Sequence, residues 1–206
     1  MSYLYNLLKQ FLALLLTTTD KYVGNFGVSI IIVTILIKIA LLPLTLKQDK
    51  SMKEMRKLQP EIDKLKEKYA NDKQMLNIKT MELYKEHKVN PAGGCLPLLL
   101  QLPILFALFG VLRSGIIPKD SSFLWLKLSE PDPFYILPVL NGAVSFLQQK
   151  LMGTADSNPQ MKNMMYIFPI MMIMISYKMP SGLQVYWLTS SILAVVQQYF
   201  IMKKGA

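Results

Sequence analysis

Five long apolar runs dominate the chain and predict helices that span a membrane. A helix needs about 20 mostly apolar residues to cross the hydrocarbon core of a bilayer. Pro, Gln and Lys interrupt several runs, so we expect these helices to lean on one another or on water, because lipid cannot satisfy freed backbone groups. The runs are Val28–Leu46, Cys95–Val111, Phe134–Leu151, Met164–Met179 and Leu183–Met202.

A charged segment, residues 47–90, separates the first run from the second. It holds 12 Lys and Arg and 8 Asp and Glu, more than half of the charge of the chain. Apolar residues within it recur every three or four positions and indicate two amphipathic helices that break at Asn71 and Asp72. We expect a helical hairpin whose apolar stripes contact each other, with the charged faces left to solvent or a partner. The stripe residues are Met52, Met55, Leu58, Ile62, Leu65 and Tyr69, then Leu76, Thr80, Leu83 and Tyr84.

The N-terminal residues 1–21 resemble a signal peptide only loosely. The apolar run Phe11–Leu16 is short, Lys9 precedes it, and no Ala-x-Ala cleavage pattern follows. We expect instead an amphipathic helix that lies on the membrane surface.

The distribution of basic residues predicts the orientation in the membrane. With residues 47–90 in the cytoplasm and five alternating spans, 16 Lys and Arg fall on the cytoplasmic side and 6 on the outer side. Loops rich in Lys and Arg stay in the cytoplasm, so the N-terminus is expected outside and the C-terminus inside.

The composition excludes several other classes of protein. Hydrophobic residues make up 52% and charged residues 17%, with a net charge of +10, as in a membrane protein with basic ends. A single Cys and a single His argue against a disulfide or a zinc or iron–sulfur site. Neither a Ser/His/Asp set nor a glycine-rich nucleotide loop occurs, so we expect neither enzymatic activity nor a cofactor.

Lys38 is the most informative residue, because it lies in the middle of the first run. A charge at mid-bilayer costs about 3 kcal/mol or more unless water or an opposite charge solvates it. The five runs contain neither Asp nor Glu, so we expect a water-filled cavity around Lys38; the alternative is a span end that lies closer to Lys38. Glutamines such as Gln101 and Gln148 could form other polar walls of this cavity, or could only join helices by hydrogen bonds.

Several motifs resemble the YidC/Oxa1/Alb3 family of membrane protein insertases. They cover about residues 22–202, in the order and at the spacing of the family. The most specific match is the sequence from Asn90 to Pro103. The others are residues 37–44 around Lys38, Leu58–Glu61, Phe123–Trp125, Pro131–Pro133, Pro180–Leu183, Tyr186–Trp187 and Gln197–Gln198.

The resemblance implies an all-α polytopic membrane protein with five transmembrane helices around a hydrophilic groove. That groove is closed on the outer side and open to cytoplasm and lipid, and the cytoplasmic hairpin receives the client. In the family a positive residue, usually Arg, lies in the groove and corresponds to Lys38. Gln148 and Trp187 match the other groove positions best, followed by Tyr186, and Gln101 completes the expected client-binding set.

The chain differs from the pattern of the family in several ways. Lys replaces Arg, which keeps the charge without the planar bidentate group. The large extracytoplasmic domain of Gram-negative members is not expected, so the chain resembles the compact bacterial form, although it lacks the lipoprotein Cys that is common in compact Gram-positive members. The tail is short and basic, which argues against the ribosome binding attributed to long tails.

The expected segments follow from the runs and the motifs together. They are an interfacial helix (1–21), a first span (22–46), the cytoplasmic hairpin (47–90), a second span (91–112), an extracytoplasmic loop (113–133), a third span (134–151), a cytoplasmic loop (152–163), a fourth span (164–179), a fifth span (180–202) and a basic tail (203–206).

The family implies a multi-pass protein of the bacterial cytoplasmic membrane that inserts other proteins. Its expected partners are nascent membrane protein clients and the lipid bilayer, with the ribosome and the Sec translocon as further candidates and no direct contact with nucleic acid. Two alternatives stay open at this point. One is a small-molecule or anion transporter, and the other is a structural or assembly subunit.

Overall fold

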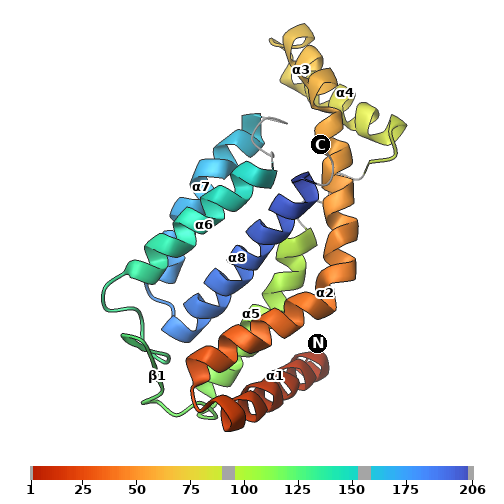
Figure 1. Cartoon of the computed structure of the whole chain (residues 1–206). Helices are drawn as coiled ribbons and strands as arrows, with labels where there is room; N and C mark the ends of the chain where they lie inside the picture. Colours follow the sequence, from red (N-terminus) through yellow and green to blue (C-terminus); the bar gives the residue numbers. More distant parts are fainter. Residues whose placement is uncertain (1, 90–95, 153–158, 204–206) are drawn as a thin grey trace.

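The computed structural model describes residues 2–89, 96–152 and 159–203, which are mostly helical. One short antiparallel hairpin pairs Ser122 with Lys127 and Phe123 with Leu126. Figure 1 shows the helices as an elongated bundle from which α3 and α4 project at one end. The elements are α1 (Ser2–Val23), α2 (Phe26–Lys57), α3 (Gln59–Lys68), α4 (Lys73–Glu86), α5 (Leu96–Arg113), β1 (Ser122–Phe123), β2 (Leu126–Lys127), α6 (Ile136–Met152), α7 (Pro159–Ser176) and α8 (Ser181–Lys203).

The helices of the bundle pack as a series and α8 lies at its centre. α8 packs against α6 on one side and against α2 on the other (Figure 1). On their far sides, α6 packs against α7 and α2 packs against α1, and α1 also packs against α5. The series therefore runs α5, α1, α2, α8, α6, α7. The main core lies where α1, α2, α5 and α8 meet, around Leu16, Ile30, Val111 and Leu183, all of which are 2% exposed or less.

α1 contributes to this core along one side and leaves an apolar surface on the other. Leu12 and Leu16 are buried, whereas Leu4, Phe11 and Leu14 are more than half exposed. A helix with apolar residues on its outer side suits a lipid interface. The interfacial position of this helix stays a prediction.

α2 is one continuous helix that runs from the bundle into the charged segment. It ends at Lys57 and contains Pro43, so the predicted boundary between residues 46 and 47 lies inside a helix. Pro43 has no N–H to donate to the carbonyl of Ile39, and its ring crowds that carbonyl. The first part of the predicted hairpin stripe, Met52 and Met55, therefore belongs to α2.

α3 and α4 form the helical hairpin, and its turn falls where Asn71 and Asp72 predicted it. The carboxylate of Asp72 accepts a hydrogen bond from the backbone N–H of Met75 at 2.9 Å and so caps the start of α4. The apolar stripes contact each other, as expected, in a small separate core. Its buried residues are Met55, Leu58, Ile62, Leu83, Tyr84 and Val89.

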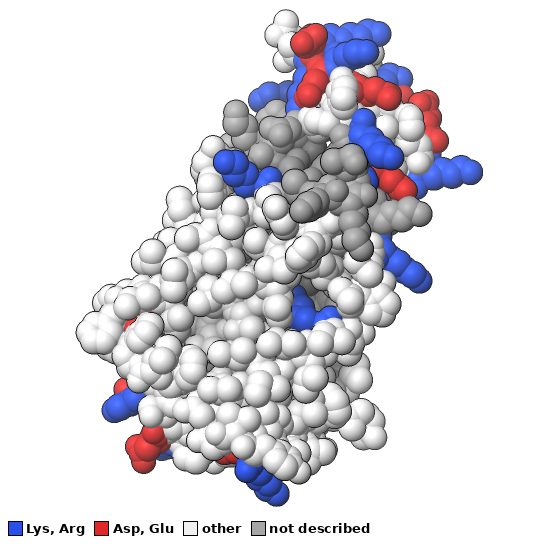
Figure 2. Space-filling view, viewed as in Figure 1, with Lys and Arg blue, Asp and Glu red and all other residues white. Residues whose placement is uncertain are grey.

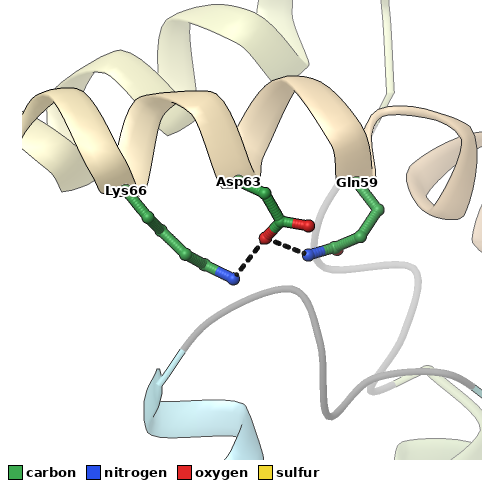
Figure 3. Close-up of polar contacts among 3 residues, drawn as sticks. All are labelled: Gln59, Asp63 and Lys66. Atoms are coloured by element: carbon green, nitrogen blue, oxygen red, sulfur yellow. Dashed lines mark hydrogen bonds and ion pairs between the residues drawn. The ribbon is translucent and has the colours of Figure 1, made fainter.

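Polar side chains also stabilise the surface of α3. Figure 3 shows Gln59, Asp63 and Lys66 on the same side of this helix. The ammonium of Lys66 lies 2.8 Å from Oδ1 of Asp63, and Nε2 of Gln59 donates to the same oxygen at 3.0 Å. The hydrogen bond from Lys66 is the main reason why the pKa of Asp63 lies below its ordinary value.

Most of the charge on the face seen in Figure 2 lies at the two ends of the molecule. Charged side chains gather over α3 and α4 and again at the opposite end, with a mostly uncharged band between them. Among the described residues, one helix is long and apolar enough to cross a membrane, namely α2 over Phe26–Met55. This criterion uses length and hydropathy only. Leu100–Arg113 and Tyr166–Ser176 are apolar but shorter. The number of spans stays a prediction, because polar residues such as Asn141 in α6 and Gln184 in α8 lower the hydropathy of those helices.

Residues 114–135 close the end of the bundle opposite the hairpin, which we call the loop end. Ile117, Leu126 and Leu128 are 1% exposed or less and belong to the main core. The carbonyl of Glu130 accepts from the backbone N–H of Ser181 at 2.7 Å and from its hydroxyl at 2.8 Å. These bonds satisfy the first polar groups of α8, which an isolated helix leaves without partners.

Asp132 holds this loop against the start of α6. It is 1% exposed. Its carboxylate accepts from the backbone N–H of Leu137 at 2.7 Å, from that of Phe134 at 3.1 Å, and from Nε1 of Trp125 at 3.0 Å. A carboxylate near a helix N-terminus is favoured by the helix dipole as well as by the hydrogen bonds.

We expect Asp132→Ala to destabilise the protein by about 3 kcal/mol, because three N–H groups, that of Leu137 buried and the other two part-buried, lose their acceptor. Thermal unfolding in detergent or nanodiscs measures this change. Asp120→Ala, an exposed residue of the same loop, serves as the control and should unfold as the wild type does. Equal unfolding temperatures for the two variants would contradict the role of Asp132.

We expect Lys66→Ala to raise the pKa of Asp63 toward its ordinary value, because the main hydrogen bond to the carboxylate is lost. In the wild type, the lowered pKa stabilises the hairpin at pH values above the ordinary pKa. This contribution disappears as the pH falls through the lowered value. The measurement is an NMR titration of the Asp63 carboxyl carbon in nanodiscs. As a control, Lys64→Ala should leave the titration of Asp63 unchanged. An unchanged titration in Lys66→Ala would show that the hydrogen bond from Lys66 does not lower the pKa of Asp63.

Candidate functional site

A seam of polar residues runs along the side of α2 that faces into the bundle. Thr34, Lys38, Thr45 and Gln48 follow one another at intervals of four, seven and three residues, which places them along one face of a helix. Thr34 and Gln48 are buried, and Lys38 and Thr45 are half-buried. Leu36, by contrast, lies on the other side of the helix and is 50% exposed.

Lys38 occupies the middle of this seam. At 1.5 Å per residue it lies about 18 Å from the start of α2 and about 15 Å from Gln48. Figure 2 shows a basic side chain in a hollow of the otherwise uncharged middle of the molecule. A charge in such surroundings acts over a longer distance than one in water, because the dielectric constant is lower.

Gln101 and Tyr186, two of the predicted site residues, are hydrogen-bonded to each other. Nε2 of Gln101, on α5, donates to the hydroxyl oxygen of Tyr186, on α8, at 2.7 Å. Tyr186 is 3% exposed and also lines a small apolar pocket between α1, α2, α5 and α8, together with Leu12, Thr34 and Ile104. The pair therefore joins two helices that otherwise have few contacts.

Trp187 and Gln148 lie on neighbouring helices of the other half of the bundle. Trp187 follows Tyr186 on α8 and points to a different side of that helix, since successive residues differ by about 100°. Its indole Nε1 is buried, without a hydrogen-bond partner among the described residues. Gln148 is half-buried on α6, which packs against α8. Within the described ranges, no hydrogen bond joins Gln148 to Trp187.

Other polar residues belong to the same interior, and the sequence did not single out Thr45, Asn141 and Gln184 among them. Nε2 of Gln197 donates to the hydroxyl of Thr45 at 3.0 Å and joins α8 to α2. Asn141 of α6 and Gln184 of α8 are fully buried, and Nδ2 of Asn141 donates to the carbonyl of Gln184 at 3.5 Å. The spacing of Thr34, Thr45 and Gln48 relative to Lys38 could have revealed the α2 seam.

The site offers hydrogen bonds and one positive charge, and it offers no arrangement typical of catalysis. In the part of the chain that the structure describes, no three His, Cys, Asp or Glu side chains gather to bind a metal ion. Apolar helices with charge at both ends and polar residues turned inward are typical of a helical membrane protein. Such an interior suits the binding of a polar group inside a bilayer.

The family model described as "60Kd inner membrane protein" matches residues 18–206. The chain therefore belongs to this family, which includes the YidC insertases, as the motifs predicted.

Two curated relatives and one solved structure illustrate the similarity. A protein of Fusobacterium nucleatum named "Membrane protein insertase YidC" is 85% identical over the full length of both chains. A protein of the same name from Anaeromyxobacter dehalogenans is 46% identical over 89% of this chain, which spans only 34% of that relative. The crystal structure of an active YidC insertase with its first transmembrane domain resolved matches with a TM-score of 0.77 and 29% identity. It covers 95% of this chain, which spans 46% of that one.

We expect the Gln101–Tyr186 hydrogen bond to contribute about 0.6 kcal/mol to the stability of the bundle, a typical value for such bonds in membranes. A double-mutant cycle with Gln101→Leu, Tyr186→Phe and the combined variant isolates this contribution from that of packing. The measurement is the free energy of unfolding in detergent micelles. Strictly additive effects of the two single substitutions would show that the hydrogen bond does not stabilise the protein.

Proposed function

We propose that the protein is a membrane protein insertase of the bacterial inner membrane. The observation that carries the proposal is the inward polar seam of α2, with Lys38 at its centre, in a bundle that is uncharged along its middle. The naming of the relatives as insertases and the match to an insertase structure support it.

The arrangement of the helices fits a groove with one closed and one open end. The loop end is filled by buried apolar side chains of residues 114–135, so a client does not enter there. The opposite end carries the charged hairpin of α3 and α4. A hydrophilic segment of a client therefore enters from the hairpin end, which we place in the cytoplasm, with the N-terminus outside.

The apolar segment of the client leaves along the two helices at the ends of the series. On α5, Phe106 is 58% exposed, and on α7, Ile167, Ile170 and Met174 are 57% exposed or more. Flexible Met side chains suit contact with varied apolar partners. We propose that these surfaces guide the client into lipid while its hydrophilic segment stays in the groove.

The groove lowers the barrier that a hydrophilic segment meets in the membrane. Transfer of an unpaired polar group out of water costs about 2–7 kcal/mol, depending on the reference state. Water, the ammonium of Lys38 and the side chains of Gln101, Gln148, Tyr186 and Trp187 replace part of that hydration. The energy comes from burial of the client's apolar segment, from translation, or from the membrane potential at about 2.3 kcal/mol per charge per 100 mV.

The partners follow from this role. Nascent membrane proteins are the clients, and the charged faces of the hairpin receive them; the ribosome and the Sec translocon are further candidate partners. A small-molecule or anion transporter is a weaker alternative, because none of the relatives described above is named as one. Insertion of a client by the purified protein would exclude the other alternative, a purely structural or assembly subunit.

If Lys38 attracts the client by its charge, Lys38→Arg should retain insertion. Lys38→Ala should reduce the insertion of clients with acidic tails, and Lys38→Glu should reduce it further, since Glu repels an acidic tail across a poorly screened distance. Clients with neutral tails should be affected less. The measurement is protease protection of the translocated tail in proteoliposomes that contain purified protein.

The control for these variants is their folding, checked by thermal unfolding in the same lipid. Equal insertion of acidic tails by the wild type and by Lys38→Glu would exclude an electrostatic role for Lys38. No insertion of any client by the wild-type protein would refute the proposed function itself.

A further inference from the structure

A second polar group of the α2 seam lies near its hairpin end. Gln48 is 5% exposed, and neither Nε2 nor Oε1 of its carboxamide has a hydrogen-bond partner among the described residues. A buried polar group without a partner costs about 1–3 kcal/mol. Hydration cannot offset that cost, because both atoms are shielded from solvent.

Gln48 adjoins a hydrogen-bonded contact between α2 and α8. Thr45 precedes it by three residues and lies on the same face of α2. The hydroxyl of Thr45 accepts from Nε2 of Gln197 at 3.0 Å. Gln198, next along α8, is 7% exposed. Carboxamides and a hydroxyl are thus gathered at the hairpin end of the contact between α2 and α8.

The chemistry of a carboxamide identifies its ligand. It presents one carbonyl acceptor and an NH₂ donor side by side, the same groups that a peptide unit presents. It can therefore accept from a backbone N–H and donate to a backbone C=O of an extended chain. Such bonds do not depend on the side chains of that chain, whereas the charge of Lys38 distinguishes acidic segments from neutral ones.

We propose that Gln48, together with Thr45 and Gln197, binds the main chain of the client's extended hydrophilic segment at the hairpin end of the groove. This inference rests on the proposed function and adds the chemical group that is recognised. The client reaches Gln48 when the hairpin ends of α2 and α8 separate. The Thr45–Gln197 hydrogen bond then breaks, so that the hydroxyl of Thr45 and the carboxamide of Gln197 can bind the same main chain. Hydrogen bonds to the client replace the Thr45–Gln197 bond and also satisfy the carboxamide of Gln48.

The test uses Gln48→Leu in the full-length protein and two synthetic clients in proteoliposomes. One client has a neutral glycine-rich tail, and the other has the same tail built of sarcosine, which lacks the backbone N–H. We expect Gln48→Leu to reduce protease-protected insertion of the glycine tail by about fivefold, the factor for one hydrogen bond. The reduction should be clearly smaller for the sarcosine tail, because Gln48 accepts no hydrogen bond from it.

Two controls separate binding from folding. Gln10→Leu replaces an exposed glutamine of α1 and should insert both clients as the wild type does. Gln48→Leu should unfold at the same temperature as the wild type or at a higher one, because it removes an unsatisfied carboxamide. A lower unfolding temperature would show that Gln48 has a partner in the resting protein and would overturn the proposal.

The other outcomes are equally decisive. Wild-type levels of insertion by Gln48→Leu would overturn main-chain binding alone and leave the insertase function intact. Equal losses with the glycine and sarcosine tails would overturn it as well, since the effect would not depend on the backbone N–H. Failure of the wild-type protein to insert either client would refute both proposals.

Discussion

A polar side chain inside an apolar helix bundle has to find its hydrogen bonds within the molecule, and α8 takes part in those that join different helices. Tyr186 accepts from Gln101 of α5, Gln197 donates to Thr45 of α2, and Gln184 donates to the carbonyl of Met179. Because α8 also packs against both α2 and α6, it joins the two halves of the bundle. The positions of the inward-facing polar residues therefore depend on this helix.

The same requirement explains why the loop end is so firmly closed. Two helices, α6 and α8, begin there, and the first N–H groups of any helix have no partners within that helix. Asp132 and the carbonyl of Glu130 supply acceptors for them, while Leu126 and Leu128 fill the space between. The closure of the loop end is thus a by-product of the way in which the helix ends are satisfied.

The sequence predicted the helical class and the turn of the hairpin, because both depend on local periodicity and on Asp72 as a cap. It did not predict that one helix, α2, continues to Lys57 through the change from apolar to charged residues. Hydropathy changes at the membrane surface, but a helix does not have to end there.

The candidate site was only partly predictable for a related reason. Lys38 stands out because a charge in an apolar run is costly. The pairing of Gln101 with Tyr186 and of Thr45 with Gln197 joins residues more than 80 positions apart. Which residues of two helices meet depends on how those helices pack, and periodicity within one helix does not contain that information.

The continuity of α2 gives the hairpin a mechanical connection to the interior. Lys38, Gln48 and the base of the hairpin lie on one rod of 32 residues, about 48 Å long. Pro43, which lies between Lys38 and Gln48, weakens that rod at one point. A tilt of about 10° at Pro43 would displace Lys57, about 21 Å away, by roughly 4 Å. A load on the hairpin, such as an arriving polypeptide, would therefore bend the part of α2 that carries Gln48 while the part that carries Lys38 stays in register with α8.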